Sequence, residues 1–325
     1  RKRDGTMGGN LRGGLLALAA FGTYSTHDVA VKYLGGHYAA FQIVFFSTLL
    51  SLPLVVVMLM RDRRAGTLIP NHPWWTALRV AASVFTSVSA FYGFATLPLA
   101  QVYAILFATP LLITLLAIPI LGERVRLRRG IAVGVGLAGV MIVLRPGSAE
   151  LGLGHLAVLT AACGSAIAAI VMRKIGTEER SEVLLLYPMI ANLAVMGTLM
   201  PFVYRPMPLE DLGALAVMAV LGLIGNLLAI YAYRIAEAGV VAPMQYSQIL
   251  WATAYGLLFF EEVPDVFTAI GAAVIIASGL YILSREGRAR ASETRPISGS
   301  QVRAGIGTVP KTGHGDSDRG RPGKP

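Results

Sequence analysis

The sequence contains the stretch Leu121-Gly122-Glu123-Arg124-Val125, and a similar stretch, Phe260-Glu261-Glu262-Val263-Pro264, follows at a spacing of 139 residues. The residues behind the two stretches repeat at a spacing of 140, since Gly139, Ile142 and Gly147 correspond to Gly279, Ile282 and Gly287. A steady period across an acidic turn and the apolar run after it indicates an internal duplication. The sequence therefore predicts two related halves.

The rest of the chain is mostly apolar. Of its 325 residues, 55% are hydrophobic and 14% are charged, whereas about a quarter of the residues in a soluble domain are charged. These values exclude an ordinary soluble domain and also disorder of the main body. A single cysteine, Cys163, excludes a disulfide scaffold and a cysteine-rich metal fold.

Apolar runs long enough to cross a bilayer as helices follow one another from Leu11 to Leu283. Ten spans are predicted, at 11–34, 38–60, 74–97, 98–121, 130–144, 155–175, 182–204, 212–236, 240–260 and 266–283. The alternative is eight or nine spans, because the joins at Gly35-Gly36, Leu97-Pro98 and Ala238-Gly239 are short. The predicted organisation is a cytoplasmic N-terminal segment (1–10), a first five-helix repeat (11–147), a second five-helix repeat (148–284) and a disordered basic cytoplasmic tail (285–325).

The first apolar run differs from a cleaved signal peptide. It is too long, it lacks an Ala-x-Ala cleavage site, and its distal half carries charges, so we interpret it as a retained span. The chain begins with Arg1, and Met7 is a candidate start of the natural chain.

Basic residues are distributed unequally between the connections. Fifteen Lys and Arg fall on the side that holds residue 1, and two, Arg145 and Arg205, fall on the other. Positively charged loops stay in the cytoplasm, so both termini are predicted there, and the net charge of +10 needs no nucleic-acid partner. Because each half has an odd number of spans, the second half is predicted to be inverted, with Glu123 cytoplasmic and Glu262 external. Inverted repeats are typical of carriers whose binding site lies between the halves, although channels and scaffolds are also duplicated.

Charged residues within the first span need a physical reason, because a charge in a bilayer costs at least ~2.5–3.5 kcal/mol. Asp28 and Lys32 are four residues apart and share a helix face, so each can neutralise the other. We interpret Asp28, its neighbour His27 and Lys32 as candidates for gating or for coupling to protons. The alternative is a structural ion pair, with Lys32 extending toward the lipid headgroups.

Uncharged polar and aromatic residues recur in the fourth and ninth spans, which are counterparts under the repeat. Amide groups can bind polar edges of a ligand, and Tyr and Trp offer rings to a planar or aliphatic one. Interhelical hydrogen bonding is the alternative for any single residue. The predicted substrate-binding set is Gln101, Tyr103, Gln245, Tyr246, Gln248 and Trp251, with Tyr92 and Asn226 from neighbouring spans.

Recognisable catalytic chemistry is missing from the sequence. It contains no Gly-x-Ser-x-Gly, no phosphate-binding Walker loop and no His-Glu-x-x-His, and its five histidines have no metal-ligand spacing. We therefore predict no catalytic residues, no metal site and no cofactor. Gly130 and Gly134 form a Gly-x-x-x-Gly pattern and Gly139 follows, and these glycines favour close helix packing and a homodimer contact.

These motifs resemble the drug/metabolite transporter superfamily, and specifically its ten-helix EamA-type branch. The resemblance rests on Leu121-Gly122-Glu123-Arg124-Val125, on Leu144-Arg145-Pro146-Gly147, on Gln248-Ile249-Leu250-Trp251-Ala252 and on Phe260-Glu261-Glu262-Val263-Pro264-Asp265, and it extends over nearly all of 11–283. It implies a multi-pass carrier of small metabolites, such as amino-acid derivatives, vitamins, nucleoside-like compounds or drugs, in a bacterial inner membrane.

Details within the first two spans resemble a subgroup that includes riboflavin and S-adenosylmethionine carriers. They are Asp28 with Lys32 and the run Phe41-Gln42-Ile43-Val44-Phe45-Phe46. The chain departs from these relatives at Ser47, where they often have arginine, and at Glu261, which replaces the glycine of the second Gly-Glu turn. The expected function is secondary active transport of a small metabolite across the inner membrane by alternating access. A membrane-embedded enzyme and a passive channel are the alternatives.

Overall fold

The protein is built from helices. A computed structural model describes residues 2–60, 68–123, 127–146, 151–176, 178–236 and 238–289, and these ranges contain no strand. The helices are α1 (Lys2–Gly35), α2 (Ala40–Met60), α3 (Pro73–Thr96), α4 (Leu99–Leu106), α5 (Thr109–Leu121), α6 (Leu127–Leu144), α7 (Leu153–Ile175), α8 (Ser181–Val203), α9 (Leu209–Ile235), α10 (Ala238–Met244), the 3₁₀ helix η1 (Gln245–Ser247), α11 (Gln248–Phe260) and α12 (Val266–Ala289). The predicted all-α class is confirmed.

Within the described ranges, seven helical stretches are long and apolar enough to cross a membrane, and Val266–Ile282 is a shorter apolar helix. The bounds of the seven stretches agree with predicted spans to within a few residues. The first predicted span lies in α1 and the ninth in α10, η1 and α11, and neither is among the seven. A multi-pass helical membrane protein follows from these stretches.

Two predicted spans contain breaks. The span predicted at 98–121 is divided into α4 and α5 at Phe107 and Ala108, and the span at 240–260 is divided into α10, η1 and α11. Proline lacks the amide hydrogen that continues a helix and is tolerated in a first helical turn. Pro110 lies in the first turn of α5, and Pro243 lies inside α10, two residues before η1 begins.

The first and last helices of the chain extend beyond the predicted spans. The helix α1 begins at Lys2, within the segment predicted as N-terminal to the first span. At the other end, α12 continues to Ala289, so its last residues lie in the segment predicted as a disordered tail. The remainder of that tail, 290–325, lies outside the described residues.

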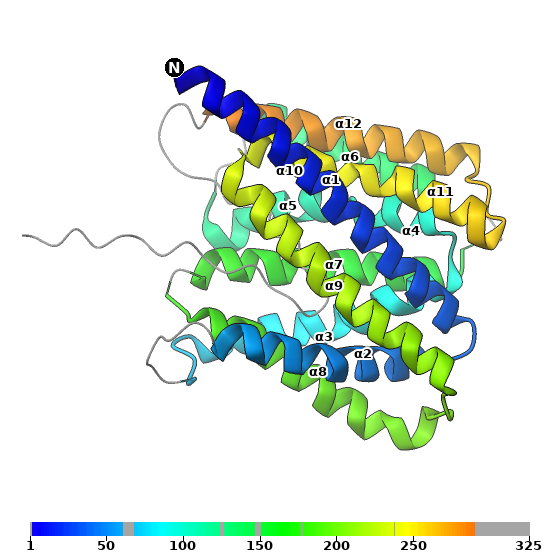
Figure 1. Ribbon diagram of the computed structural model, residues 1–325. Coiled ribbons are helices and arrows are strands. Elements are labelled where there is room, and N and C mark those ends of the chain that lie inside the picture. Colours follow the sequence, from blue (N-terminus) through cyan, green and yellow to red (C-terminus); the bar gives the residue numbers. More distant parts are fainter. Residues whose placement is uncertain are drawn as a thin grey trace, which may run out of the picture.

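Helices from the two parts of the chain pack against each other in a crossed pattern. The most extensive contacts join α1 to α9, α3 to α7 and α6 to α12, with α2 against α8 also prominent. Figure 1 shows α6 and α12 together along one edge of the bundle and α2 and α8 along the other, with α1 and α9 between them. Elements far apart in sequence therefore form the interior jointly.

Glycines allow the closest helix contact where α6 crosses α12. A Cβ added at Gly271 would lie 2.7 Å from the backbone oxygen of Gly139, and one added at Gly139 would lie 3.0 Å from the oxygen of Gly271. In contrast, Gly130 and Gly134 have nothing within 4 Å of an added Cβ. The predicted close packing is therefore found at Gly139, and within this chain it is not found at Gly130 or Gly134, which lie earlier on α6. The homodimer contact stays a prediction.

Two helices of equal length end in the same way. Both α5 and α11 span 13 residues, and each is followed by a residue in the left-handed region, Gly122 (φ 69°) and Glu261 (φ 54°). In each turn the next amide donates to a carbonyl six residues earlier, Glu123 to Ala117 (3.2 Å) and Glu262 to Gly256 (2.9 Å). The two acidic turns therefore share one backbone geometry, in which the residue after the left-handed position bonds back into its own helix.

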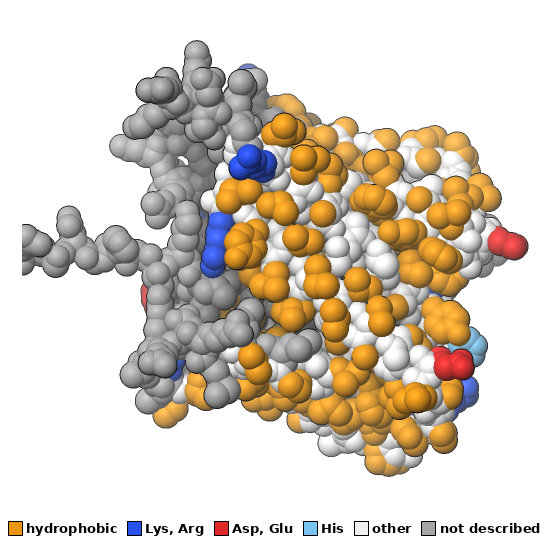
Figure 2. Space-filling model, viewed as in Figure 1, with side chains coloured by type: hydrophobic (Ala, Val, Ile, Leu, Met, Phe, Trp, Pro, Cys, Tyr) orange, Lys and Arg blue, Asp and Glu red, His pale blue; other side chains and the backbone are white. Residues whose placement is uncertain are grey.

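The outer surface is largely apolar. Phe85, Leu250 and Leu258 expose 66%, 71% and 73% of their area. Figure 2 shows hydrophobic side chains over most of one face, with charged side chains near its two ends. Apolar area of this extent is costly in water and favourable against lipid.

Candidate functional site

A buried carboxylate lies at the centre of the candidate site. Asp28, on α1, is 2% exposed. One of its carboxylate oxygens lies 2.8 Å from Nδ1 of His27, and the other accepts a hydrogen bond from the hydroxyl of Tyr103 on α4. A charge can stay inside a membrane protein when neighbouring groups bond to it, so these two partners account for the position of Asp28.

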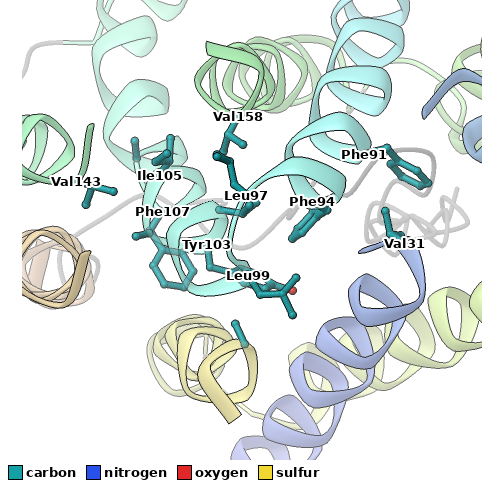
Figure 3. Packing of buried hydrophobic residues seen from close by; sticks show 14 of the residues in the cluster. Val31, Phe91, Phe94, Leu97, Leu99, Tyr103, Ile105, Phe107, Val143 and Val158 are labelled. Carbon is teal, nitrogen blue, oxygen red and sulfur yellow. The ribbon is translucent and has the colours of Figure 1, made fainter. Parts of the chain in front are cut away.

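Tyr103 links three helices. Its hydroxyl donates to Asp28, lies 3.4 Å from the hydroxyl of Ser25 on α1, and accepts a bond of 3.4 Å from the side-chain amide of Gln248 on α11. The Tyr103 ring packs against Phe94 and Phe107, with ring centroids 5.6 and 6.2 Å away. Figure 3 shows these rings gathered around α4 within the apolar core. The predicted residues Asp28, Tyr103 and Gln248 are therefore brought together.

Aromatic residues lie along α11 and α1 beside this polar cluster. Trp251 stacks on Tyr255 with ring centroids 6.1 Å apart, and the hydroxyl of Tyr255 lies 3.0 Å from that of Thr26. Gly22 leaves room for Trp251, since a Cβ there would lie 3.2 Å from the indole ring. His27 meets the edge of Phe91 at 6.3 Å. Flat apolar rings and hydrogen-bonding groups therefore lie side by side where α1 meets α11.

Lys32 has partners other than the one expected from its spacing. Its ammonium group lies 2.5 Å from a carboxylate oxygen of Glu262 and donates to the carbonyl of Leu97 at 2.6 Å. The interpretation that Asp28 and Lys32 neutralise each other is therefore wrong. Side chains four residues apart can meet, but Glu262 and Tyr103 supply closer partners from other helices.

The remaining predicted residues do not join the cluster. Gln101 bonds instead to Nε2 of His155 on α7 at 2.9 Å. Tyr246 packs edge-on against Phe107, and its buried hydroxyl has no hydrogen-bond partner within the described ranges. Asn226 is buried and its amide nitrogen also lacks a partner there. Tyr92 is 38% exposed, and Gln245 is half-buried.

Sequence reasoning missed several residues of the site. Ser25, Thr26 and Tyr255 join the polar cluster or its aromatic wall, and Glu262 binds Lys32. The repeat had singled out Glu262 as a turn residue but gave no sign of its partner. Ser25 could have been found, because it lies three residues before Asp28 on one helix face.

Comparison with known proteins places the chain in a class of membrane transporters. The model of the EamA-like transporter family matches residues 11–145 and again residues 152–284. The chain belongs to this family. It is a multi-pass membrane transporter of small metabolites, and not an enzyme.

Three curated bacterial relatives are similar over most of their length. The chain is 28% identical to the S-adenosylmethionine uptake transporter of Rickettsia prowazekii, over 83% of this chain and 92% of that protein. It is 25% identical to the pseudopaline exporter CntI of Pseudomonas aeruginosa, over 82% and 94%. It is 27% identical to the riboflavin transporter of Rhizobium johnstonii, over 77% and 82%. Uptake and export both occur among these relatives.

Proposed function

We propose that the chain is a ten-pass secondary transporter of the inner membrane, in which two inverted five-helix halves expose one site alternately to each side. In this proposal α4 and α5 together form one broken pass, and α10, η1 and α11 together form another, which gives ten passes in total. The polar cluster of Asp28, Tyr103 and Gln248 is the observation that carries this proposal, because it joins the halves in the bundle interior. Carriers with inverted repeats bind substrate at such interfaces, often beside broken helices.

The contacts between helices of the two halves support a two-fold relation between the halves. The first helix of one half, α1, packs on α9 of the other, and the corresponding α7 packs on α3. The pairs α6–α12 and α2–α8 join each helix to its own counterpart. A two-fold axis in the membrane plane would relate the halves in this way. The two separate family matches agree with a duplication.

The orientation follows from the basic residues. The excess of Lys and Arg on the side of residue 1 favours a cytoplasmic position for both termini. Glu123 then faces the cytoplasm and Glu262 the outside.

The chemistry around Asp28 favours a small ligand with a flat ring and hydrogen-bonding edges. Gln248 and Tyr103 can bond such edges, while Trp251 and Tyr255 can cover the ring. The substrates in two relatives' names, S-adenosylmethionine and riboflavin, both have this character. A carboxylate at the centre further favours a substrate with a positive charge.

A stabilisation screen followed by a transport assay tests this function. Purified protein is heated with S-adenosylmethionine, riboflavin, amino acids and nucleosides, and a true ligand raises the melting temperature. The best ligand is then measured in proteoliposomes, where saturable uptake and counterflow are expected. Flux without saturation would show a pore, and chemical conversion of the ligand would show an enzyme.

We also propose that Asp28, with His27 beside it, couples transport to protons. Their contact gives a proton-exchanging pair within the bundle. Collapse of the proton gradient should abolish accumulation of substrate while counterflow continues. Asp28→Asn should abolish accumulation without any collapse, and it should also weaken counterflow, because it removes the carboxylate proposed to contact the substrate. Accumulation that survives both changes would reject the coupling.

A further inference from the structure

The two acidic turns each hold a cation from the opposite half of the chain. Glu262 of the second half binds Lys32 of the first, and Glu123 of the first half binds Arg173 of the second. We propose that these two ion pairs are equivalent gates at opposite ends of the molecule, one opening while the other stays closed. This proposal deepens the alternating-access function and rests on it. We call them the Lys32 gate (Lys32 and Glu262) and the Arg173 gate (Arg173 and Glu123).

The Lys32 gate closes three segments against one another. Lys32 lies near the end of α1 and also donates to the carbonyl of Leu97, between α3 and α4. The second carboxylate oxygen of Glu262 accepts the amide of Leu99 at 3.0 Å, in the first turn of α4. The ring of Phe260 lies 5.3 Å from the Lys32 ammonium. One ion pair therefore joins α1, the start of α4 and the end of α11.

The Arg173 gate repeats this arrangement with two cations. Arg173 lies near the end of α7 and binds Glu123, just beyond α5. Its neighbour Lys174 donates to the carbonyl of Ile120 at 3.0 Å and lies 4.3 Å from the ring centroid of Trp75 on α3. Carboxylate, carbonyl and aromatic ring are thus all engaged at this end too. Lys32 makes all three contacts by itself, whereas at this end Arg173 contacts the carboxylate and Lys174 contacts the carbonyl and the ring.

Shared backbone geometry argues against a coincidence. Each glutamate follows a left-handed residue and donates its amide six residues back into its own helix, so the turn presents its carboxylate in a fixed position. Each cation lies in the last turn of the helix that begins its half. The two pairs are therefore the same contact formed twice with the halves exchanged.

The physical setting allows such pairs to act as switches. The side chains are partly enclosed, with exposures of 10% and 19% at the Lys32 gate and 29% and 28% at the Arg173 gate. A pair in this setting holds together while water is excluded, because an unpaired charge there is costly. When one mouth of the transporter opens, water enters and hydrates both charges, so separation is tolerated at that end alone.

Spin-label distances at the two ends test the proposal without a known substrate. In a Cys163→Ser background, labels at His37→Cys and Val263→Cys report on the end of the Lys32 gate, and labels at Leu127→Cys and Ile235→Cys report on the other. Each pair joins the two halves through exposed positions.

Lys32→Gln should shift the first distance distribution to longer values and leave the second unchanged or shorter. Arg173→Gln should do the reverse.

Two further variants separate a gate from a merely structural pair. The exchange Arg173→Glu with Glu123→Arg should restore the wild-type distribution, since Arg173 is the partner of Glu123. Arg145→Gln is the matched control, because it removes an ion pair with Asp265 between α6 and α12, which we expect to stay packed. Unchanged distributions in both gate variants, or widening at both ends in either one, would overturn the proposal. Wild-type protein without counterflow would instead reject the carrier function, whatever the distances.

Discussion

At the scale of single residues, Asp28 determines where the site lies. Placing a carboxylate inside a bilayer costs at least ~2.5–3.5 kcal/mol, so its retention requires compensation. His27 and Tyr103 supply this compensation, and Gln248 and Ser25 bond to Tyr103 in turn. The hydroxyl of Tyr103 holds the carboxylate in place, and a ligand that bonds to Asp28 lies beside it. The hydroxyl of Tyr103 is therefore the group whose removal should affect binding most directly.

Tyr103→Phe tests this role. The change leaves the ring packing intact but removes a hydrogen bond to a buried charged group, which costs about 1–3 kcal/mol. We expect the rate of transport at limiting substrate to fall about tenfold, since about 1.4 kcal/mol corresponds to a factor of ten. The rate falls because the carboxylate of Asp28 is no longer held in its orientation. Uptake into proteoliposomes measures the effect. Tyr204→Phe, at an exposed tyrosine, is the matched control. Equal uptake by the two variants would remove Tyr103 from the site.

The sequence was informative about which residues matter and less so about their partners. A charge within an apolar run is conspicuous, so Asp28 and Lys32 could be found without a structure. Their partners come from α4 and from the turn after α11, at separations of 75 residues for Tyr103 and much more for Glu262. Helix periodicity describes neighbours on one helix only. Helix periodicity therefore favoured a pair of Asp28 with Lys32. In the structure both residues instead contact segments that are distant in the sequence.

At the scale of the elements, the turns after α5 and α11 differ in one residue that has an energetic consequence. Gly122 adopts a left-handed conformation without steric cost, whereas Glu261 adopts it with a side chain. This conformation costs a residue with a Cβ about 1–2 kcal/mol. Glu261→Gly should therefore stabilise the protein by about 1 kcal/mol, seen as a higher melting temperature in detergent. Gly122→Glu should lower it, and a decrease with Glu261→Gly would contradict this account of the turn.

The crossing of α6 and α12 gives a second prediction at this scale. Gly271→Ala would place a methyl group 2.4 Å from a side-chain carbon of Val143 and 2.7 Å from the oxygen of Gly139, so the helices must separate. Overpacking of this kind costs about 1–3 kcal/mol. Gly134→Ala is the control, since it meets no atom within 4 Å and gains about 1 kcal/mol of helix propensity. The melting temperature should fall with the first change and hold or rise with the second.

Element boundaries were easier to predict than contacts between elements. Runs of apolar residues give the length of each helix, so most predicted spans agree with the helices to within a few residues. Proline interrupts helical hydrogen bonding, and Pro110 and Pro243 mark both breaks. Pro53 and Pro188 lie inside helices that continue unbroken, so proline alone does not locate a break. Likewise, Gly130 and Gly134 lie on α6, the helix that packs closely on α12, but they do not lie at the contact. Which face meets a neighbour depends on the crossing of two helices, and one sequence segment does not contain that information.

At the scale of the whole molecule, the proposed mechanism depends on the inversion of the two halves. The crossed packing of α1 on α9 and α7 on α3 is the result expected of a two-fold axis, and the odd number of proposed passes in each half places that axis in the membrane plane under the proposal. The bias of basic residues points the same way, since positive loops stay in the cytoplasm. Parallel halves would instead bring both acidic turns to one end. The sidedness of these two turns therefore decides between the arrangements.

Labelling of single cysteines in intact cells measures this sidedness. In a Cys163→Ser background, Val263→Cys lies beside Glu262, and Leu127→Cys lies at the start of α6, just after the turn that holds Glu123. Both positions are about three-quarters exposed, at 77% and 79%. A membrane-impermeant maleimide should react with Val263→Cys in intact cells and with Leu127→Cys only after the membrane is opened. Because a thiol reacts only on the side that the reagent reaches, labelling of both in intact cells would place the turns on one face. The halves would then be parallel, and the Lys32 and Arg173 gates could not close opposite ends.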